Sequence, residues 1–173
     1  GFISSFLKIL NDEKPDYIAV CSDTKAPTFR HLKYDAYKAN RKKMPDELIE
    51  QIPALYNIFE KACIPLLKLD TYEADDIIGT FSKSVDNDKN HTFIVSGDKD
   101  LMQLVNNSTS VYSLGNRFKP TTIYNESKVI DKWKIAPNKI VDYLALVGDS
   151  SDNIPGVEGV GPKTAVKLIN EFN

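Results

Sequence analysis

Three short apolar segments, separated by helical patterns, constrain the fold of this chain more than any other feature of its sequence. Each is predicted to form a buried strand: YIAVC at 17–21, PLLKL at 65–69 and TFIVS at 92–96. Amphipathic helical patterns precede, separate and follow them, at 2–10, at about 45–62 and from 73 onward. Strands that alternate with helices in this way predict an α/β fold, with a mostly parallel sheet flanked by helices.

The second half of the chain adds two more strands and then becomes helical. A short helix is expected at 101–105, and strands at 110–114 and 121–124, the latter in an edge hairpin. Helices follow at about 126–133 and 138–147, and a last helix begins after a glycine-rich turn. We therefore expect a core domain over residues 1–125 and a helical lobe over 126–173. No apolar run reaches 18 residues, so the sequence predicts no membrane span.

Acidic residues gather where the predicted strands end. They are Asp23 after the first strand, Glu73, Asp75 and Asp76 after the second, Asp98 and Asp100 after the third, and Asp149 and Asp152 in the stretch GDSSDN. The carboxyl ends of parallel strands share one edge of a sheet, where open α/β sheets place their sites. Taken alone, each group also suits a helix cap, a helix start or a turn.

Eight carboxylates at one edge would repel one another strongly unless cations neutralise them. Oxygen ligands suit Mg²⁺ or Mn²⁺, and the absence of a His or Cys cluster in the sequence argues against zinc. A pair of such cations is the usual apparatus for in-line displacement at phosphorus. The acidic residues therefore predict a two-cation site for phosphoryl chemistry.

A basic segment, residues 25–43, contrasts with these acids. It holds seven Lys or Arg and one acid, with Phe29, His31, Tyr34 and Tyr37 interleaved, in a chain of net charge −2. A run of charge is usually a solvated face. Aromatic rings among the cations favour nucleic-acid binding instead, because rings stack on bases while cations meet phosphates. We expect this segment to be mobile and to bind a polyanion.

The glycine-rich turn GVEGVGPKTAVKLI, from Gly156 to Ile169, has some features of a nucleotide-binding P-loop. Pro162 interrupts that pattern, and the polar stretch before the turn is not a buried strand, so the nucleotide interpretation is weak. Such a turn points backbone N–H groups and a helix N-terminus at a phosphate, with Lys163 beside it. A helix start without a ligand is the alternative. Together with the acids and the basic segment, the turn favours a nucleic-acid backbone.

Five motifs, in order, carry a resemblance to a known family: SDTKAPTFRH, YKANRKKMP, YEADD, SGDKDLMQL and GDSSDNIPGVEGVGPKTA. They resemble the 5′→3′ exonuclease domain of bacterial DNA polymerase I and its stand-alone relatives, within the flap endonuclease superfamily. The resemblance implies a PIN-like α/β core with a helical arch at about 25–45 and a helix-three-turn-helix lobe. It implies hydrolysis of DNA at 5′ ends, nicks, primer junctions and 5′ flaps, in replication and repair.

The resemblance also implies an oligomeric state, a location and a partner. We expect a monomer in the bacterial cytoplasm, associated with the nucleoid, that is fused to or works with a DNA polymerase. It implies two Mg²⁺ ions, replaceable by Mn²⁺. By motif, Asp23, Glu73, Asp75 and Asp76 resemble the first-metal residues, and Asp98, Asp100, Asp149 and Asp152 the second-metal residues. Lys38 and Arg41 resemble the cations that stabilise the scissile phosphate, with Tyr37 stacking on a displaced base and Lys42 beside the DNA. Gly156, Gly159, Gly161, Lys163 and Thr164 resemble the duplex-binding turn, which also holds a K⁺ ion in the family.

One departure from the family pattern concerns the start of the chain. The family has a first strand that ends in a metal-binding Asp, ahead of the helix that residues 2–10 resemble. On that resemblance we expect a fragment with a weakened first metal site and with exposed sheet edges. The alternatives to a nuclease are a module that grips branched DNA without cutting, a PIN-type ribonuclease and, least favoured, a P-loop ATPase.

Overall fold

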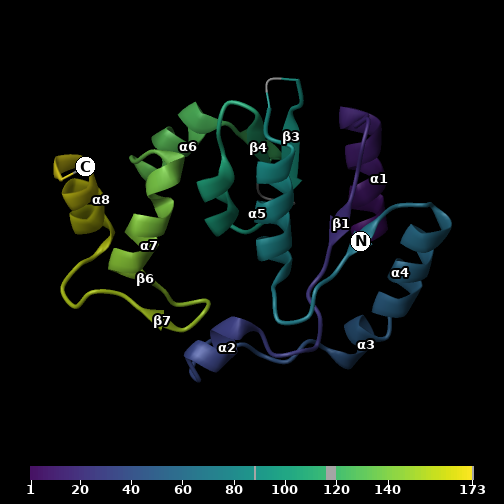
Figure 1. Ribbon diagram of the computed structural model, residues 1–173, viewed down its shortest axis with the longest axis horizontal. Helices are drawn as coiled ribbons and strands as arrows, with labels where there is room; N and C mark the ends of the chain where they lie inside the picture. Colours follow the sequence, from purple (N-terminus) through teal and green to yellow (C-terminus); the bar gives the residue numbers. More distant parts are fainter. Residues whose placement is uncertain (88, 116–119, 173) are drawn as a thin grey trace.

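A computed structural model of the chain describes residues 1–87, 89–115 and 120–172. Its strands form short parallel pairs flanked by helices, which confirms the α/β class (Figure 1). Strand β1 (Val20–Cys21) lies parallel to β2 (Leu66–Leu67). Strand β3 (Thr92–Val95) lies parallel to β4 (Thr109–Ser113), and β5 (Thr122–Tyr124) runs antiparallel to β4, as the expected edge hairpin requires.

The single sheet expected from the alternation is wrong for the described part of the chain. There β1 and β2 form one sheet, and β3, β4 and β5 form another, without hydrogen bonds between the two. Helix α1 (Phe2–Glu13) packs on the helix that precedes β2, where the rings of Phe2 and Phe6 meet Phe59 at centroid distances of 6.1 and 5.4 Å. Aromatic packing of this kind fixes α1 without burying any of its residues fully.

Two helices replace the single helix expected over about 45–62. They are α3 (Asp46–Ile49) and α4 (Ile52–Lys61), with Pro53 in the first turn of α4. Proline lacks an N–H, and its ring clashes with the carbonyl four residues earlier, here that of Ile49. The same residue is well tolerated at a helix start, so the break falls just before it.

Helix α5 (Ala74–Ser84) and the 3₁₀-helix η1 (Asp100–Leu104) both begin at the acidic motifs. Glu73 caps α5: its side chain accepts from the backbone of Asp76, whose own side chain accepts from the N–H of Glu73 at 3.0 Å. This reciprocal capping satisfies backbone donors that a helix start leaves free. It also fixes two of the predicted site residues at one helix end.

The hydrophobic core joins β3 and β4 to the C-terminal helices. These are α6 (Glu126–Trp133), the 3₁₀-helix η2 (Pro137–Lys139), α7 (Ile140–Val147) and α8 (Pro162–Glu171). The core consists of Ile94, Leu101, Met102, Val105, Val111, Val129, Ile135, Ile140 and Ile169. Helix α8 thus packs on the same core as the sheet. None of the described helices is long and apolar enough to cross a membrane.

A tight hairpin between α7 and α8 carries the GDSSDN motif. Strand β6 (Gly148–Asp149) pairs antiparallel with β7 (Ile154–Pro155). Gly148 has φ +79°, and a Cβ there would lie 2.4 Å from the backbone nitrogen of Gly156. Only glycine fits such a close approach in a left-handed conformation. The hairpin turns the chain back across the molecule, toward the ends of β1 and β3 (Figure 1).

Candidate active site

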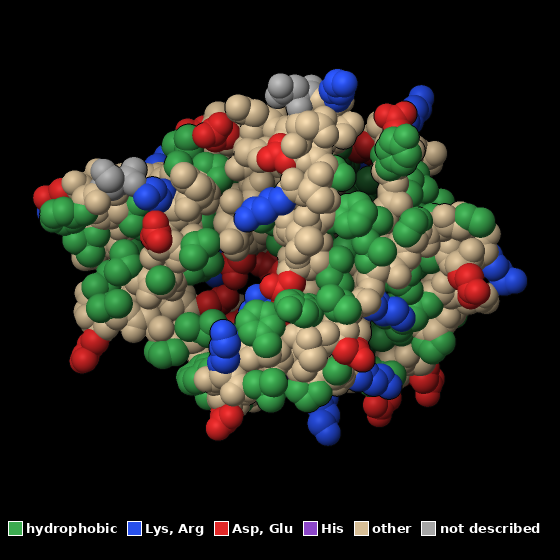
Figure 2. Space-filling view, in the orientation of Figure 1, with side chains coloured by type: hydrophobic (Ala, Val, Ile, Leu, Met, Phe, Trp, Pro, Cys, Tyr) green, Lys and Arg blue, Asp and Glu red, His purple; other side chains and the backbone are tan. Residues whose placement is uncertain are grey.

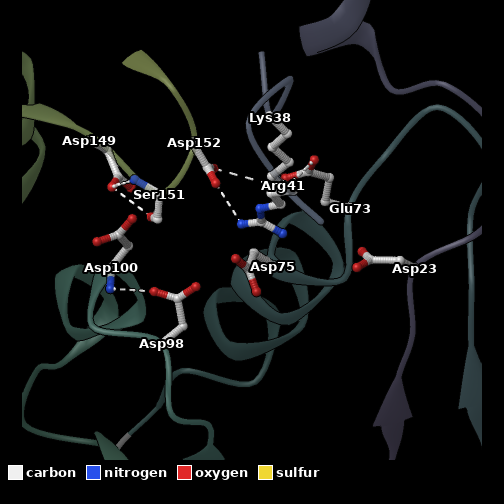
Figure 3. A pocket seen from close by; sticks show the side chains of 10 residues that line it. All are labelled: Asp23, Lys38, Arg41, Glu73, Asp75, Asp98, Asp100, Asp149, Ser151 and Asp152. Atoms are coloured by element: carbon white, nitrogen blue, oxygen red, sulfur yellow. Dashed lines mark hydrogen bonds and ion pairs between the residues drawn. The ribbon is translucent and has the colours of Figure 1, made fainter. Parts of the chain in front are cut away.

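A pocket of about 140 Å³ lies between α5, the loop after β3 and the β6–β7 hairpin. In the space-filling view, acidic side chains line a hollow between α5 and the C-terminal helices (Figure 2). The lining residues are Asp23, Lys38, Arg41, Glu73, Asp75, Asp98, Asp100, Asp149, Ser151 and Asp152 (Figure 3). The structure therefore brings together seven of the eight predicted carboxylates and both predicted cations.

Backbone hydrogen bonds hold several of these acids in place. Asp23, after β1, accepts from the N–H of Ala74 at 2.7 Å, which joins the end of β1 to the start of α5. Asp98, after β3, accepts from the N–H of Asp100 at 2.9 Å. Short polar side chains that accept from nearby N–H groups form local turns of this kind. The expected gathering at the strand ends is therefore met, although two sheets supply it.

The hairpin contributes Asp149, Ser151 and Asp152 from the other side of the pocket. Asp149 Oδ1 accepts from both the N–H and the hydroxyl of Ser151, at 2.9 and 2.6 Å. Sequence reasoning passed over Ser151. Its position two residues after Asp149 is the signal that was available, because Asp side chains bond to the backbone two residues on in such turns.

Cationic side chains from the basic segment reach into the acidic pocket. Lys38 Nζ lies 2.6 Å from Glu73 Oε1, and Arg41 donates to Asp152 Oδ1 at 2.5 Å. Lys99, from the motif after β3, lies 3.7 Å from both Asp100 and Asp149. The expected mobile, polyanion-binding segment is in this structure docked on the acids, with one helix, α2 (Phe29–Lys33), and a series of turns. Opposite charges at such short range contribute to the docking.

The side chain of Tyr37, for which the resemblance implies stacking on a displaced base, is buried in the wall of the pocket. The residue is 5% exposed, and its hydroxyl lies 3.0 Å from both Glu73 Oε2 and Asp152 Oδ2. Burial, followed by these two hydrogen bonds, raises the pKa of the phenol well above its ordinary value. Its ring edge instead packs against His31, with a centroid distance of 5.1 Å. Tyr37 thus joins the basic segment to the pocket wall.

Asp76 is the one predicted carboxylate that does not line the pocket. It lies at the third position of α5, where its side chain folds back onto the helix start. Arg30 faces it there, and the hydrogen bonds from that guanidinium hold the pKa of Asp76 below its ordinary value. The position of Asp76 thus differs from that expected of a first-metal residue.

Two carboxylates in the pocket hold their protons unusually tightly. Burial, together with the negative charges of Asp98, Asp23 and Glu73, raises the pKa of Asp75 to about 6. Burial also raises the pKa of Asp100 to about 6, although Lys99 opposes the shift. Asp100 Oδ1 is buried without a hydrogen-bond partner among the described residues. A buried carboxylate oxygen that accepts no hydrogen bond is costly, and a bound cation would remove that cost.

The pocket fits hard divalent cations by its chemistry, because its ligands are oxygen atoms in a field of uncompensated negative charge. As the described side chains stand, no three His, Cys, Asp or Glu residues converge tightly enough to enclose an ion by themselves. Glu73 and Asp152 are turned toward Lys38 and Arg41 instead. Small rotations of these carboxylates would exchange an ammonium or guanidinium partner for a metal ion.

The glycine turn lies outside the pocket, between β7 and α8. Gly156 is closed in by backbone, since a Cβ there would lie 2.3 Å from the carbonyl carbon of Val147. Gly159 has φ +77° in open space, and Gly161 precedes Pro162 at the start of α8. Lys163 and Thr164 are exposed, as is Lys42 in the basic segment. The turn thus leaves backbone and side chains open to a partner at one end of the molecule (Figure 1).

Comparison with known proteins places the whole chain in one family. The model described as "5′-3′ exonuclease, N-terminal resolvase-like domain" matches residues 1–134, and "5′-3′ exonuclease, C-terminal SAM fold" matches residues 135–173. DNA polymerase I of Bacillus subtilis is 43% identical over 173 residues, which cover 100% of this chain and 20% of that protein. A 5′-3′ exonuclease of Aquifex aeolicus is 41% identical over 172 residues, covering 99% of this chain and 58% of that protein.

Solved structures give the same result. The T5 5′-exonuclease with bound zinc ions has a TM-score of 0.82 and 26% identity, over 99% of this chain and 66% of that one. The bacteriophage T5 D15 flap endonuclease, in a pseudo-enzyme-product complex with DNA and metal ions, has a TM-score of 0.81 and 25% identity, over 99% of this chain and 65% of that one. The chain spans a fifth of the polymerase and less than two thirds of the exonuclease.

Proposed function

The chain belongs to the 5′-3′ exonuclease family, and from that membership we propose that it is the nuclease portion of a metal-dependent 5′→3′ exonuclease and 5′-flap endonuclease. The observation that carries this proposal is the pocket itself. Seven carboxylates and two cationic side chains from five separate motifs share one cavity of about 140 Å³. A structural role for each motif would not require them to meet.

The carboxylates extend across the pocket, from Asp23 and Glu73 on one side, past Asp75 and Asp152, to Asp98, Asp100 and Asp149 on the other (Figure 3). Asp23, Glu73 and Asp75 would hold one divalent cation, and Asp98, Asp100, Asp149 and Asp152 would hold the other. We propose Mg²⁺, with Mn²⁺ as a substitute, because both prefer carboxylate oxygens. Such ions supply a hydroxide at neutral pH and neutralise the leaving oxygen.

Lys38 and Arg41 would act on the substrate phosphate. Each is held by a carboxylate in the pocket, Lys38 by Glu73 and Arg41 by Asp152. An entering phosphodiester offers these cations a second anionic partner, and their charge opposes the charge that develops on phosphorus. Tyr37 is buried between the same two acids and would hold the segment that carries both cations in place against the pocket.

The partner we propose is DNA with a free 5′ end: a flap, a nick or a primer junction. Lys42 and the exposed turn with Gly156, Gly159, Gly161, Lys163 and Thr164 would contact the phosphate backbone. We assign this turn to a helix-three-turn-helix that holds a K⁺ ion, in a lobe over residues 126–173 beside a PIN-like core over 1–125. On the family's pattern, the protein is a nucleoid-associated monomer that is fused to or works with a DNA polymerase.

The test is cleavage of a duplex with a labelled 5′ flap, titrated with Mg²⁺ or Mn²⁺. We expect metal-dependent cutting near the junction, lost in Asp98→Ala and retained in the matched surface variant Asp12→Asn. Asp98→Ala should still bind the duplex, because the turn lies outside the pocket. Binding without cutting by the unaltered protein would favour a DNA-binding module, and a preference for single-stranded RNA would favour a ribonuclease.

A further inference from the structure

Arg30 and Asp76 form an ion pair beside the pocket that the mechanism above does not use. Arg30, in α2, donates from Nη1 and Nη2 to the two carboxylate oxygens of Asp76, in α5, both at 2.7 Å. A guanidinium and a carboxylate that meet in this two-pronged way fix direction as well as distance. The side chains are 32% and 23% exposed, so the pair is partly shielded from water.

Both oxygens of Asp76 are occupied by protein donors. Oδ2 accepts from Arg30 and also from the N–H of Glu73, at 3.0 Å, while Oδ1 accepts from the other arm of Arg30. Glu73 and Asp75, its neighbours in the same motif, line the pocket, and Asp76 does not. A residue that ligated a metal would have to give up the guanidinium and the helix cap together.

The Arg30 side of the pair is anchored on the chain that leads into α5. The guanidinium lies 4.6 Å from the centroid of the Phe29 ring, and that ring packs on Tyr72 at 5.7 Å. The N–H of Phe29 also donates to the carbonyl of Thr71 at 2.9 Å. Helix α2 is therefore fixed to residues 71–76 at backbone and side-chain level, at the lower end of α5 in Figure 1.

The cations of the pocket lie directly downstream of this anchor. Helix α2 ends at Lys33, and the next turns carry Tyr37 and Lys38 to Glu73. Glu73 is thus held by Asp76 at its backbone and by Tyr37 and Lys38 at its carboxylate, and Arg30 itself lies 3.8 Å from Glu73 Oε2. A shift of α2 on α5 would move the pocket's cations and Glu73 together.

We propose that Asp76 is a positioning residue rather than a metal ligand. With Arg30 it forms a latch that docks the base of the basic segment on α5 and directs Glu73 into the pocket. The inference rests on the proposed function, in which Glu73 is a metal ligand and Lys38 contacts the substrate phosphate. It differs from the role that the motif predicts for Asp76.

The two roles for Asp76 predict opposite responses to the loss of Arg30. If Asp76 is a metal ligand, Arg30→Gln frees its carboxylate and removes a positive charge, so divalent ions bind more tightly. If Asp76 is part of the latch, Arg30→Gln and Asp76→Asn release the same contact and weaken metal binding alike. The double variant then loses no more than the worse single variant, because either change breaks the Arg30–Asp76 contact, and only Arg30→Gln also removes the weaker pair with Glu73.

The experiment measures Mn²⁺ affinity by electron paramagnetic resonance for the wild type, Arg30→Gln, Asp76→Asn, the double variant and Asp75→Asn, with Asp12→Asn as control. Loss of a residue that orients a ligand typically weakens metal affinity or activity by about 10–100-fold, and we expect losses in that range for both latch variants. Trypsin should also cut both variants faster within residues 33–43. Arg30→Lys keeps the positive charge but cannot donate to both oxygens of Asp76 at once, so it should recover only part of the lost Mn²⁺ affinity. It replaces Arg30→Gln in the comparison if Arg30→Gln does not fold.

Three results would overturn the latch: tighter or unchanged Mn²⁺ binding in Arg30→Gln, additive losses in the double variant, or unchanged trypsin cutting. Neither readout requires DNA cleavage. If the wild type binds Mn²⁺ but never cuts a flap, the proposed function fails, and Mn²⁺ affinity and trypsin cleavage of the variants still test the latch. If it cuts and the variants behave as independent sites, the latch alone fails.

Discussion

The single residue Asp100 illustrates how a group placed for ligand binding can lower the stability of the protein without its ligand. Its Oδ1 atom is buried and accepts no hydrogen bond from the described residues, with Lys99 Nζ 3.7 Å away, and burial raises its pKa to about 6. In metal-free protein the folded state therefore holds more protons than the unfolded state between about pH 4 and pH 6, so this group's contribution to stability falls as pH rises through that window. Above the window the cost is fully present.

We therefore predict that Asp100→Asn raises the melting temperature of the metal-free protein at pH 7.5 more than at pH 4.5. The same change should weaken Mn²⁺ binding by at least about tenfold, a loss that even residues behind a metal ligand often cause. Calorimetric melts at both pH values, with EDTA and with Mn²⁺, measure both effects. An equal shift at the two pH values would show that Asp100 is not held protonated by its surroundings.

Gly148 and Gly79 should respond in opposite directions to alanine. Gly148 has φ +79°, and a Cβ would lie 2.4 Å from a backbone nitrogen, so we expect Gly148→Ala to destabilise the fold by about 2–4 kcal/mol. Gly79, in α5, would place its Cβ 3.7 Å from Leu104, an ordinary contact, so Gly79→Ala should stabilise by about 0.5–1 kcal/mol. Urea unfolding of both variants measures the difference, and a loss of similar size in both would contradict it.

The sequence predicted the pocket better than it predicted the orientation of each side chain. Acids after three strands and in GDSSDN marked seven lining residues, because the position of a strand end follows from hydrophobic pattern. Asp76 and Tyr37 lie differently from what their motifs predict because their partners, Arg30 and Glu73, are 46 and 36 residues away in the sequence. Pairing at that separation depends on tertiary packing, which no local pattern encodes.

At the scale of elements, hydrogen bonds dock the basic segment on the β6–β7 hairpin beside the pocket. Asn153 has φ 59° and donates from Nδ2 to the carbonyl of Ala36 at 2.7 Å, while Lys38 donates its N–H to the carbonyl of Asp152 at 2.9 Å. Asn40 adds a third bond, to the carbonyl of Ser150 at 2.8 Å. These contacts are made mostly to backbone, so they hold the segment whatever the state of the acids.

We predict that Asn153→Ala loosens this docking at a cost of about 1–2 kcal/mol, since it removes the bond to Ala36 and places alanine in a left-handed conformation. Faster trypsin cleavage after Lys38 and Arg41 is the readout. Asn153→Gly relieves the backbone strain and still lacks the amide. Equal protease sensitivity in the two variants would assign the docking to the hydrogen bond, whereas full protection in Asn153→Gly would contradict that assignment.

Helices were easier to predict than the sheet. The pattern located α6 at 126–133 as the structure has it, because its cap Asn125 and its apolar face are local signals. It missed the break before Pro53, a signal that was present and overlooked. The division of the strands into two sheets has no local signal, because strand partners are chosen by packing across the whole molecule.

At the scale of the whole molecule, the proposed chemistry and the proposed grip on duplex lie in different places. The acidic pocket lies near the centre of the face in Figure 2, and the glycine turn before α8 lies toward one end of the molecule in Figure 1. Net charge is −2, so attraction to DNA must come from local cations rather than from the protein's overall field. Binding and cutting should therefore respond to different substitutions.

Lys163→Ala tests this separation. If Lys163 meets one phosphate, its loss should weaken duplex binding to a similar degree for all sequences and reduce the slope of log affinity against log salt by about 1. Mn²⁺ affinity should be unchanged, because Lys163 does not line the pocket. The matched control is Lys61→Ala, an exposed lysine in α4 on the far side of the molecule, which should alter neither quantity. Fluorescence anisotropy at four salt concentrations gives the slope. An unchanged slope in Lys163→Ala would place the duplex elsewhere on the surface, and weaker Mn²⁺ binding would mean that the two regions are coupled through α7 and the hairpin.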